Sequence, residues 1–273
     1  MKLLLIRHGE TVDNVAHKYA GVTDSHLTNH GVLQALRLGE HLTTPKSAGG
    51  AGLIFTHIFS SDLQRARKTG QAILDAQLVR TDGVNVPSPS AATVTQLFEL
   101  REVDFGSREG TSYRSSHRPT PQVIRGPGYQ SRESNESMAA RADRFIDDYL
   151  IPAVMEVHFN NSAVNTKNHA IAVASHGIFL GILWMRIIIR FHRSNVSTAV
   201  ECSGRKPHWS NTGYILLDIL PGDMEEGLKG CMCLVEGMNI KTHLQGLERT
   251  GGGVGSAKAD DRQRQISDFF TPQ

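Results

Sequence analysis

Two short apolar runs in this chain each lead directly into a histidine followed by a glycine. The first run covers residues 3–6 and leads into Arg7, His8 and Gly9, and the second, in the segment HAIAVASHG, leads into His176. A continuous apolar run of this length is typical of a parallel strand that is buried on both faces. In an open α/β sheet, ligands bind beyond the carboxyl ends of such strands. If the two strands are neighbours, both imidazoles converge on one point.

Strand and helix patterns alternate along the rest of the chain. Further strands are expected at 54–59, 93–98, 214–219 and 232–235, and helices after the expected N-caps Thr28 and Asp62 and over 136–158 and 178–191. Strands that alternate with helices at these intervals favour a mainly parallel sheet with helices on both faces. We therefore predict the α/β fold class, as a single three-layer αβα domain with a mainly parallel sheet.

The composition of the chain changes near residue 246. From there the stretch RTGGGVGSAKADDRQRQ is rich in glycine and polar residues, which is typical of a segment that buries too little apolar surface to fold. Within the domain, residues 106–135 are dominated by Arg, Ser, Pro and Gly without a visible period, and we expect an irregular lid there. The predicted organisation is a domain over 1–245 and a disordered tail over 246–273.

Charge and cysteine content argue against several classes of protein. The formal net charge is +2, so no overall attraction points to nucleic acid as a direct partner. The three cysteines are too few and too unevenly placed for a disulfide framework, and a reducing compartment is the default. The longest apolar stretch, 178–189, is interrupted by Arg186 and is too short to span a membrane. We therefore expect a protein of the cytoplasm, the nucleus or both, without a membrane partner.

Two arginines belong to the same predicted edge of the sheet. Arg7 precedes His8, and Arg65 lies in the first turn of the helix expected after Asp62. The planar fork of arginine matches phosphate oxygens and keeps its charge, and a neutral imidazole nitrogen is a nucleophile. Two histidines and two arginines around one point therefore suit a phosphorylated substrate. Four cationic groups can stabilise the transition-state charge without a metal, so we expect neither a metal site nor a cofactor.

The departing oxygen of a phosphate ester needs a proton donor. Glu102, in the segment LREVDFG, follows the third predicted strand and is the expected donor. Glu99 and Glu109 are the alternatives, in which case Glu102 is a solvated carboxylate.

Four segments of the chain occur in an order that resembles a known family. LLLIRHGETVDN, SSDLQRARKT, LREVDFGSREG and ASHG, in this order, resemble the motifs of the histidine phosphatase superfamily, the phosphoglycerate-mutase-like group. The resemblance covers residues 1–219 approximately. It implies a phosphohydrolase of α/β fold that transfers a phosphoryl group to a histidine and then to water.

The resemblance also implies roles for individual residues. Glu10 and Thr11 match the first motif and are expected to orient its loop. The positions with implied chemical roles are the nucleophile His8, the proton donor Glu102, the phosphate-pocket residues Arg7, Arg65 and His176, and the pocket-lining residue Asn14.

The lid departs from the family pattern. Relatives with a similar FG-x-x-EG segment often carry tryptophan where this chain has Arg108. The lid also lacks the long insertion and the paired arginines that are typical of cofactor-dependent mutases. A phosphatase is therefore favoured, with a phosphoglycerate mutase as the alternative. The substrate stays open among sugar phosphates, phosphoglycerates, fructose bisphosphate and phosphoproteins.

A motif of a different class lies near residue 273. The segment QRQISDFF places Gln263, Ile266, Phe269 and Phe270 in the pattern Q-x-x-h-x-x-a-a, which resembles the PIP box that docks on the replication sliding clamp. One helical turn would bring the three apolar side chains to one side. The alternatives are that the phenylalanines pack on the protein's own surface or that the match is accidental. Genuine clamp binding would imply a partly nuclear protein and, in the extreme, an adaptor on a catalytically idle domain.

Overall fold

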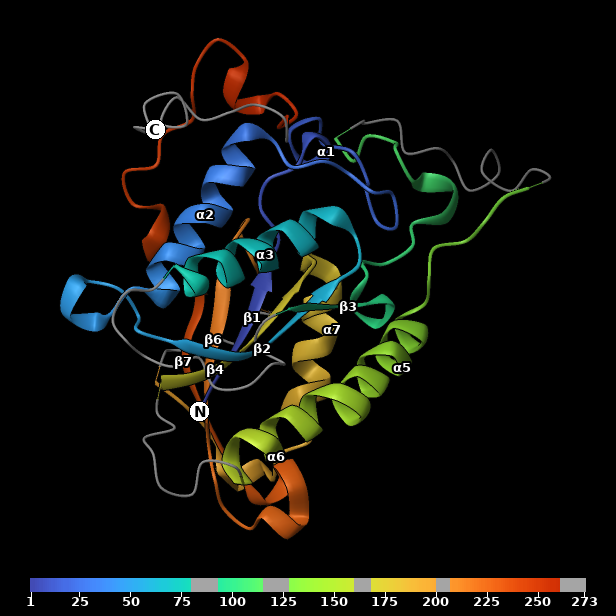
Figure 1. Ribbon diagram of the computed structural model, residues 1–273. Coiled ribbons are helices and arrows are strands. Elements are labelled where there is room, and N and C mark those ends of the chain that lie inside the picture. The colour runs from blue at the N-terminus through green and yellow to red at the C-terminus, as the bar shows by residue number, and fades with distance from the viewer. Residues whose placement is uncertain (80–92, 115–127, 160–167, 200–206, 261–273) are drawn as a thin grey trace.

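Seven strands form one sheet in the part of the chain that the structure describes. The computed structural model describes residues 1–79, 93–114, 128–159, 168–199 and 207–260, and the strand order is β3-β2-β4-β1-β6-β7-β5 (Figure 1). The strands are β1 (Lys2–Arg7), β2 (Ile54–Ser61), β3 (Val94–Leu97), β4 (His169–Ser175), β5 (Val196–Thr198), β6 (Tyr214–Leu220) and β7 (Met232–Ile240).

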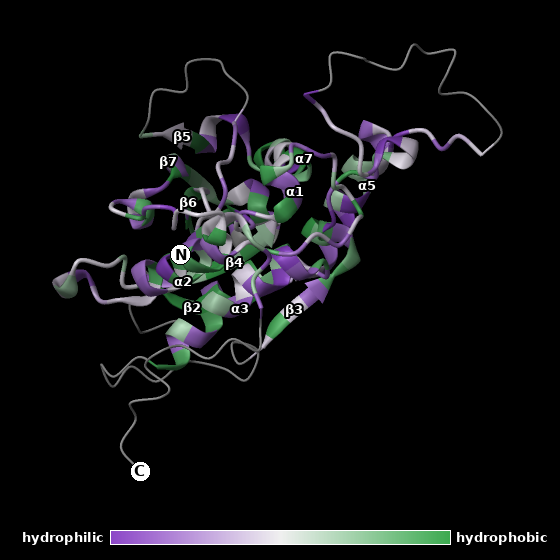
Figure 2. Cartoon of the chain, turned by 90° about the horizontal axis from the view of Figure 1, so that it is seen from above, coloured by the Kyte–Doolittle hydropathy of each residue, from purple (hydrophilic) through white to green (hydrophobic). Residues whose placement is uncertain are grey.

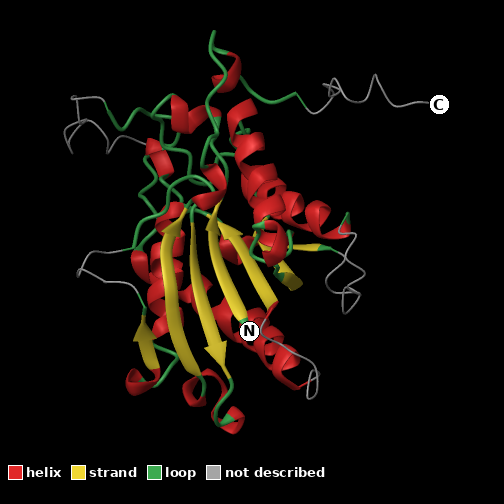
Figure 3. Cartoon of the chain, turned by 90° about the vertical axis from the view of Figure 1, so that its left-hand side faces the viewer, coloured by secondary structure: helices red, strands yellow, loops and turns green. Residues whose placement is uncertain are grey.

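The sheet is parallel in the half that contains the two strands ending before a histidine. β3, β2, β4 and β1 run in one direction, whereas β6 runs antiparallel to both of its neighbours, β1 and β7. Figure 3 shows this reversed strand among the parallel ones. The prediction of an α/β fold with a mainly parallel sheet is confirmed.

Helices cover both faces of the sheet. Successive side chains of β1 point to opposite faces, so Leu3 and Leu5 pack with α5, α6 and α7, whereas Leu4 and Ile6 pack with α2 and α3. In Figure 2 hydrophobic and hydrophilic residues alternate along the helices, as expected for helices with one face on a sheet. The helices are α1 (Val12–Val15), α2 (Asn29–Thr43), α3 (Gln64–Leu78), α5 (Asn135–Phe145), α6 (Ile151–Phe159) and α7 (Gly177–Ile188).

The amino ends of α2 and α3 are capped differently. The Thr28 hydroxyl accepts a hydrogen bond from the Gly31 amide and caps α2, as predicted. Asp62 does not cap α3, because the N-cap is Leu63, which makes no side-chain cap hydrogen bond. The Asp62 carboxylate instead accepts two hydrogen bonds of 2.7 Å from the Arg101 guanidinium. Both carboxylate oxygens thus bond to the planar guanidinium of Arg101 instead of to an amide at the start of α3.

The helix predicted over 136–158 contains a π-helical turn. α5 ends at Phe145, the π turn covers Ile146–Leu150, and α6 follows directly. The predicted helix over 178–191 is α7, which already ends at Ile188. Among the described helices, none combines the length and the apolar character needed to cross a membrane.

The residues after β7 pack against the domain as far as residue 260. A 3-10 turn at Val254–Ser256 lies beside α2, and the Asn29 amide donates a hydrogen bond of 3.0 Å to the Ala257 carbonyl. The predicted domain boundary at 246 is therefore corrected, because contacts with α2 compensate for the polar, glycine-rich composition of 246–260. The rest of the predicted tail, 261–273, lies outside the described residues.

Candidate active site

The two histidines lie side by side because β1 and β4 are neighbours. The register pairs Arg7 with Ser175, and the His8 amide donates a hydrogen bond of 3.0 Å to the Ser175 carbonyl. The ring centroids of His8 and His176 are 5.2 Å apart, and the side chains are 4% and 0% exposed. The predicted convergence of the two imidazoles is confirmed.

His8 keeps one ring nitrogen available as a nucleophile. Its Nδ1 lies 2.7 Å from the Gly9 carbonyl oxygen, and since a carbonyl only accepts, Nδ1 carries the proton and the lone pair is on Nε2. Burial, with a further contribution from the charges of Arg65 and Arg7, holds the pKa of His8 well below 6.5. The ring is therefore neutral at neutral pH, which is the form that can attack phosphorus.

His176 is oriented by Arg65, which lies in the first turn of α3. Arg65 Nε donates a hydrogen bond of 3.2 Å to His176 Nδ1, so the proton of the neutral imidazole is on Nε2. This buried Nε2–H has no acceptor in the part of the chain that the structure describes. His176 therefore retains a donor for an external acceptor, because buried donors in proteins are almost always paired.

Arg65 is held by backbone carbonyls. Its side chain is only 1% exposed, and its two terminal nitrogens donate to the carbonyl oxygens of Thr23 at 2.7 Å, Ala20 at 3.1 Å and Gly21 at 2.6 Å. Burial lowers the pKa of Arg65 to about 10, so the guanidinium stays charged at neutral pH. Carbonyl oxygens fix the geometry of the guanidinium as dipoles and leave its net charge available to an anion.

Arg7 approaches the same point from the end of β1. Its Nη1 donates a hydrogen bond of 2.8 Å to the Trp209 carbonyl, and its buried Nε has no partner among the described residues. A Cβ on Gly177, the first residue of α7, would lie 3.7 Å from this Nε. A guanidinium beside the amino end of a helix is an arrangement that attracts anions.

Positive charge at this site comes from Arg7 and Arg65 alone among the four predicted groups. Burial and the nearby guanidinium groups hold the pKa of both His8 and His176 well below 6.5, so both rings are neutral at neutral pH. Burial of both imidazoles therefore argues against the four cationic groups expected from the sequence. The site combines two fixed charges, one imidazole donor and one imidazole lone pair.

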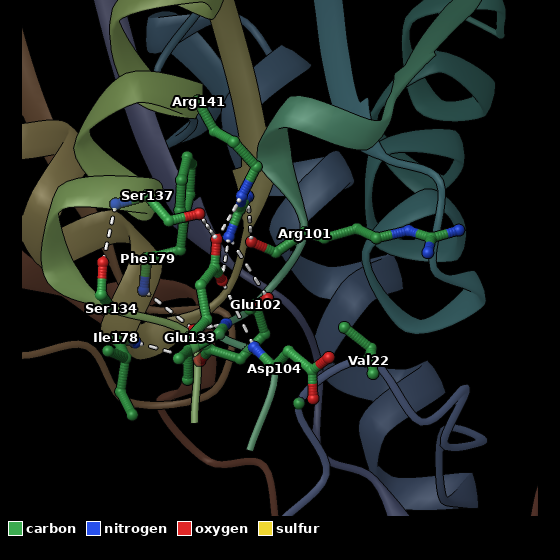
Figure 4. Close-up of polar contacts among 12 residues, drawn as sticks. Val22, Arg101, Glu102, Asp104, Glu133, Ser134, Ser137, Arg141, Ile178 and Phe179 are labelled. Carbon is green, nitrogen blue, oxygen red and sulfur yellow. Dashed lines mark hydrogen bonds and ion pairs between the residues drawn. The ribbon is translucent and has the colours of Figure 1, made fainter. Parts of the chain in front are cut away.

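Glu102 lies at the amino end of α7, beside His176. Its carboxylate is 8% exposed and accepts hydrogen bonds from the amides of Val103 at 2.9 Å, Phe179 at 2.9 Å and Ile178 at 3.0 Å (Figure 4). The first two bonds go to Oε1, and the third goes to Oε2, which keeps a second lone pair. The charge of Glu102 also raises the pKa of both arginines of the site, so the carboxylate is close to them.

The two alternative carboxylates are placed differently. Glu109 cross-links the base of the lid to the loop before α2, since it accepts hydrogen bonds from the amides of Gly21, Val22 and Phe105. Glu99 is half-buried, and its backbone carbonyl accepts from Arg141. The geometry thus favours Glu102, because its carboxylate accepts from the amides of Ile178 and Phe179, which follow His176 closely in the chain.

Asn14 is tied into the first loop. Its Oδ1 accepts hydrogen bonds from the Thr11 amide at 3.2 Å and from Asn211 Nδ2 at 3.1 Å, and its own amide donates to the Thr11 hydroxyl. Asn211 Nδ2 also donates to the His8 carbonyl, so Asn14 belongs to the same hydrogen-bond network as His8 and shapes the loop. Its predicted role in lining the pocket stays a prediction.

Two residues that border the site were not identified from the sequence patterns. Asn211 Nδ2 donates a hydrogen bond of 3.1 Å to the His8 carbonyl, and the indole of Trp209 donates one of 3.0 Å to the Leu5 carbonyl. Both residues lie in the short segment before β6, which starts at Tyr214. Because β6 runs antiparallel to β1, its amino end lies at the same edge as the carboxyl end of β1. That topological rule is the signal that could have identified them.

Arg141 organises the segment that carries Glu102. Its guanidinium donates to the carbonyls of Glu99 at 2.7 Å and Arg101 at 3.0 Å, and it forms a bidentate pair with the Glu133 carboxylate at 2.8–2.9 Å (Figure 4). It also lies 4.6 Å from the ring centroid of Phe179, whose amide binds Glu102. The patterns in the sequence did not single out this buried arginine.

The described part of the predicted lid, 106–114 and 128–135, forms an exposed rim of aromatic and basic residues. Arg108, which stands where relatives often carry tryptophan, stacks on Tyr19 at 4.5 Å and donates a hydrogen bond of 2.7 Å to its hydroxyl. Tyr113 is 48% exposed and its ring packs against Tyr19. Within the described ranges, no cluster of three or more His, Cys, Asp or Glu side chains has an arrangement suited to a metal ion.

Comparison with known proteins gives a consistent result. Residues 3–199 match the family described as histidine phosphatase superfamily (branch 1). The chain is 30% identical over 269 residues to a probable phosphatase of Schizosaccharomyces pombe, covering 97% of this chain and 78% of the relative. It is 32% identical over 188 residues to a probable phosphoglycerate mutase of Proteus mirabilis, covering 69% of this chain and 75% of the relative.

A solved structure shows the same fold. A mycobacterial glucosyl-3-phosphoglycerate phosphatase superimposes with a TM-score of 0.59 at 17% identity, covering 88% of this chain and 99% of the other. At this level of identity the match concerns the arrangement of strands and helices.

Proposed function

This chain belongs to the histidine phosphatase superfamily, and we propose that it is a phosphatase that hydrolyses a phosphomonoester through a phosphohistidine on His8. The observation that carries the proposal is the state of His8, a buried neutral imidazole whose Nδ1–H is bound to the Gly9 carbonyl and whose Nε2 lone pair is therefore free for attack.

Three side chains around His8 stabilise the transferred phosphoryl group in this proposal. Arg7 and Arg65 supply two positive charges, and His176 supplies the Nε2–H that has no acceptor among the described residues. Preorganised donors and charges of this kind stabilise the charge on the equatorial oxygens of the transition state. In the first step the Nε2–P bond forms while the bond from phosphorus to the ester oxygen breaks.

Glu102 is the proposed proton donor for the departing alcohol. Oε2 accepts one hydrogen bond from the Ile178 amide, and its second lone pair is the position that can carry a proton. In the proposal Glu102 enters the first step protonated there, gives this proton to the departing ester oxygen and becomes a carboxylate. In the second step the carboxylate takes a proton from water, water oxygen attacks phosphorus, and the Nε2–P bond breaks. His8 returns to its neutral state and inorganic phosphate leaves.

No metal takes part in this proposal, because the two arginines supply the positive charge. The experiment is a panel of sugar phosphates, phosphoglycerates, fructose bisphosphate and phosphopeptides, assayed for phosphate release with and without EDTA. We expect release of phosphate that EDTA leaves unchanged and that His8→Ala abolishes. Loss of activity with EDTA that zinc or magnesium restores would contradict the metal-independent mechanism.

A phosphoglycerate mutase is the alternative, since one group of relatives bears that name. The same panel separates the two activities, because a mutase isomerises 3-phosphoglycerate without net release of phosphate. The lid sequence, without the long insertion and paired arginines of cofactor-dependent mutases, favours the phosphatase.

Binding to a sliding clamp and location in the cytoplasm, the nucleus or both stay predictions from the sequence. Gln263, Ile266, Phe269 and Phe270 lie outside the described residues.

A further inference from the structure

Residues 246–260, named here the C-terminal strap, lie along the loop that leads into α2. The Ala259 amide donates a hydrogen bond of 3.0 Å to the Leu27 carbonyl, and the backbone amide of Asn29 donates another of 3.0 Å to the Ala257 carbonyl. The Asn29 side chain adds a hydrogen bond of 2.8 Å to the Val254 carbonyl. Figure 1 shows this segment, coloured red, above the start of α2 and beside the blue loop that carries α1.

An ion pair connects the strap to the loop that follows His8. Arg249 Nη2 pairs with the Glu10 carboxylate, and Arg249 Nη1 donates a hydrogen bond of 2.7 Å to the Ser256 hydroxyl within the strap. The Glu10 side chain is 11% exposed, whereas that of Arg249 is 40% exposed. Glu10 is therefore a nearly buried carboxylate whose charge is neutralised from the surface by the strap.

Glu10 lies two residues after His8, and its carboxylate, its backbone amide and its carbonyl all make hydrogen bonds. Its second carboxylate oxygen accepts from the Thr28 hydroxyl at 2.9 Å, and its amide donates to the Gln34 side chain at 2.9 Å. Its carbonyl accepts from the Thr28 amide at 2.9 Å. The residue between His8 and Glu10 is Gly9, whose carbonyl holds the Nδ1 proton of His8. A shift of the Glu10 backbone would therefore move the Gly9 carbonyl, which sets the orientation and tautomer of the nucleophile.

We propose that Arg249 is a positioning residue for His8, acting through Glu10 and Gly9. The inference rests on the proposed function of His8, but it concerns a segment beyond residues 3–199, where the family match ends. Removal of Arg249 leaves the Glu10 carboxylate nearly buried and without its ion pair, which favours movement of the loop towards solvent. The nucleophile then spends less time in line with phosphorus, so kcat falls while KM changes little.

The test compares Arg249→Ala, Arg249→Lys and Arg37→Ala in the full-length protein. Arg37 donates a hydrogen bond of 3.0 Å to the Gln245 carbonyl, just before the strap, whereas the Glu10 carboxylate bonds to Thr28 and Arg249, so Arg37 is the matched control. With p-nitrophenyl phosphate as substrate, Arg249→Ala should lower kcat roughly tenfold or more. Arg249→Lys, which keeps the charge, should restore most of the loss, and Arg37→Ala should behave like the wild type.

Hydrogen–deuterium exchange of the amides of residues 8–11 provides a readout that is independent of turnover. Faster exchange there in Arg249→Ala, together with the loss of kcat, supports the proposal. If Arg249→Ala has the kcat and the exchange rates of the wild type, the proposal is overturned. It is also overturned if Arg249→Ala has a lower melting temperature but an unchanged kcat at temperatures below thermal unfolding. If the wild type itself releases no phosphate, the proposed function fails, and the exchange rates alone decide whether Arg249 holds the loop.

Discussion

The Nε of Arg65 donates a hydrogen bond of 3.2 Å to Nδ1 of His176, and this contact decides which nitrogen of the imidazole carries its proton. Since Nδ1 accepts, the proton lies on Nε2, which is buried and without an acceptor among the described residues. Arg65 therefore contributes to the site in two ways, through its own charge and through the orientation of a second donor.

Replacing Arg65 with lysine should lower kcat/KM by about 10²–10³-fold, the loss typical of one transition-state donor. Lysine keeps the charge but cannot hold His176 Nδ1 and three carbonyls with one planar group. Steady-state kinetics on the best ester of the panel measures the effect. Arg67→Lys, an exposed arginine two residues further along α3, is the control. If Arg65→Lys and Arg67→Lys have the same kcat/KM, Arg65 does not belong to the proposed phosphate pocket.

Replacing Glu102 with glutamine should slow esters of alkyl alcohols much more than p-nitrophenyl phosphate. A general acid matters most when the departing oxygen is basic, and its loss typically costs about 10²–10⁴-fold. The measurement is kcat/KM for a series of esters whose alcohols differ in pKa, with Glu99→Gln and Glu109→Gln measured alongside to test the two alternative donors. A loss that is equal for all leaving groups would assign the proton transfer to Glu99 or Glu109.

Acid should destabilise the fold through the buried histidines. The folded-state pKa of both His8 and His176 is held well below 6.5 by burial, so below about pH 6.5 the unfolded chain binds more protons than the folded one. The free energy of unfolding therefore falls as the pH falls through this window, by up to about 1.4 kcal/mol per pH unit and histidine.

His8→Asn should remove the contribution of one histidine to this slope. Urea unfolding of the wild type and the variant between about pH 5 and 7.5 measures it. Other buried histidines, such as His243 with its pKa lowered to about 4, contribute equally to both proteins. Parallel curves for the two proteins would show that His8 is not kept neutral by the fold.

A peptide of residues 258–273 should bind the sliding clamp of the same organism with micromolar affinity. Gln263, Ile266, Phe269 and Phe270 have the required spacing, and ordering a free peptide costs binding energy. Calorimetric titration measures the affinity, and replacing both phenylalanines with alanine should abolish the heat signal. A wild-type peptide that shows no binding at about 100 µM clamp would refute the motif. The phenylalanines should then stabilise the domain itself, and their removal should lower its melting temperature.

The catalytic edge of the sheet could be predicted from the sequence because strand ends obey a topological rule. His8 and His176 follow apolar runs that form neighbouring parallel strands, so their convergence follows from the strand order alone. Arg65 could be placed for the same reason, since α3 starts directly beyond β2. Local patterns sufficed here because each residue lies within two or three positions of a strand end or helix start.

Contacts between distant segments could not be predicted in this way. The pair between Arg249 and Glu10 joins residues 239 positions apart, and no local pattern indicates it. Aspartate is a residue type that often caps helices, but the Asp62 carboxylate bonds to the guanidinium of Arg101, 39 residues later, and not to the start of α3. The neutral state of the histidines also depends on burial in three dimensions.

The most direct test of the account is to find the covalent intermediate. The wild-type enzyme is mixed with its best substrate, quenched in alkali within the first turnovers and digested, and the phosphorylated peptide is identified by mass spectrometry. We expect phosphate on His8, and none in His8→Asn. Phosphate on a serine or aspartate, or a His8→Asn variant that turns over at the wild-type rate, would contradict the central claim that His8 is the nucleophile.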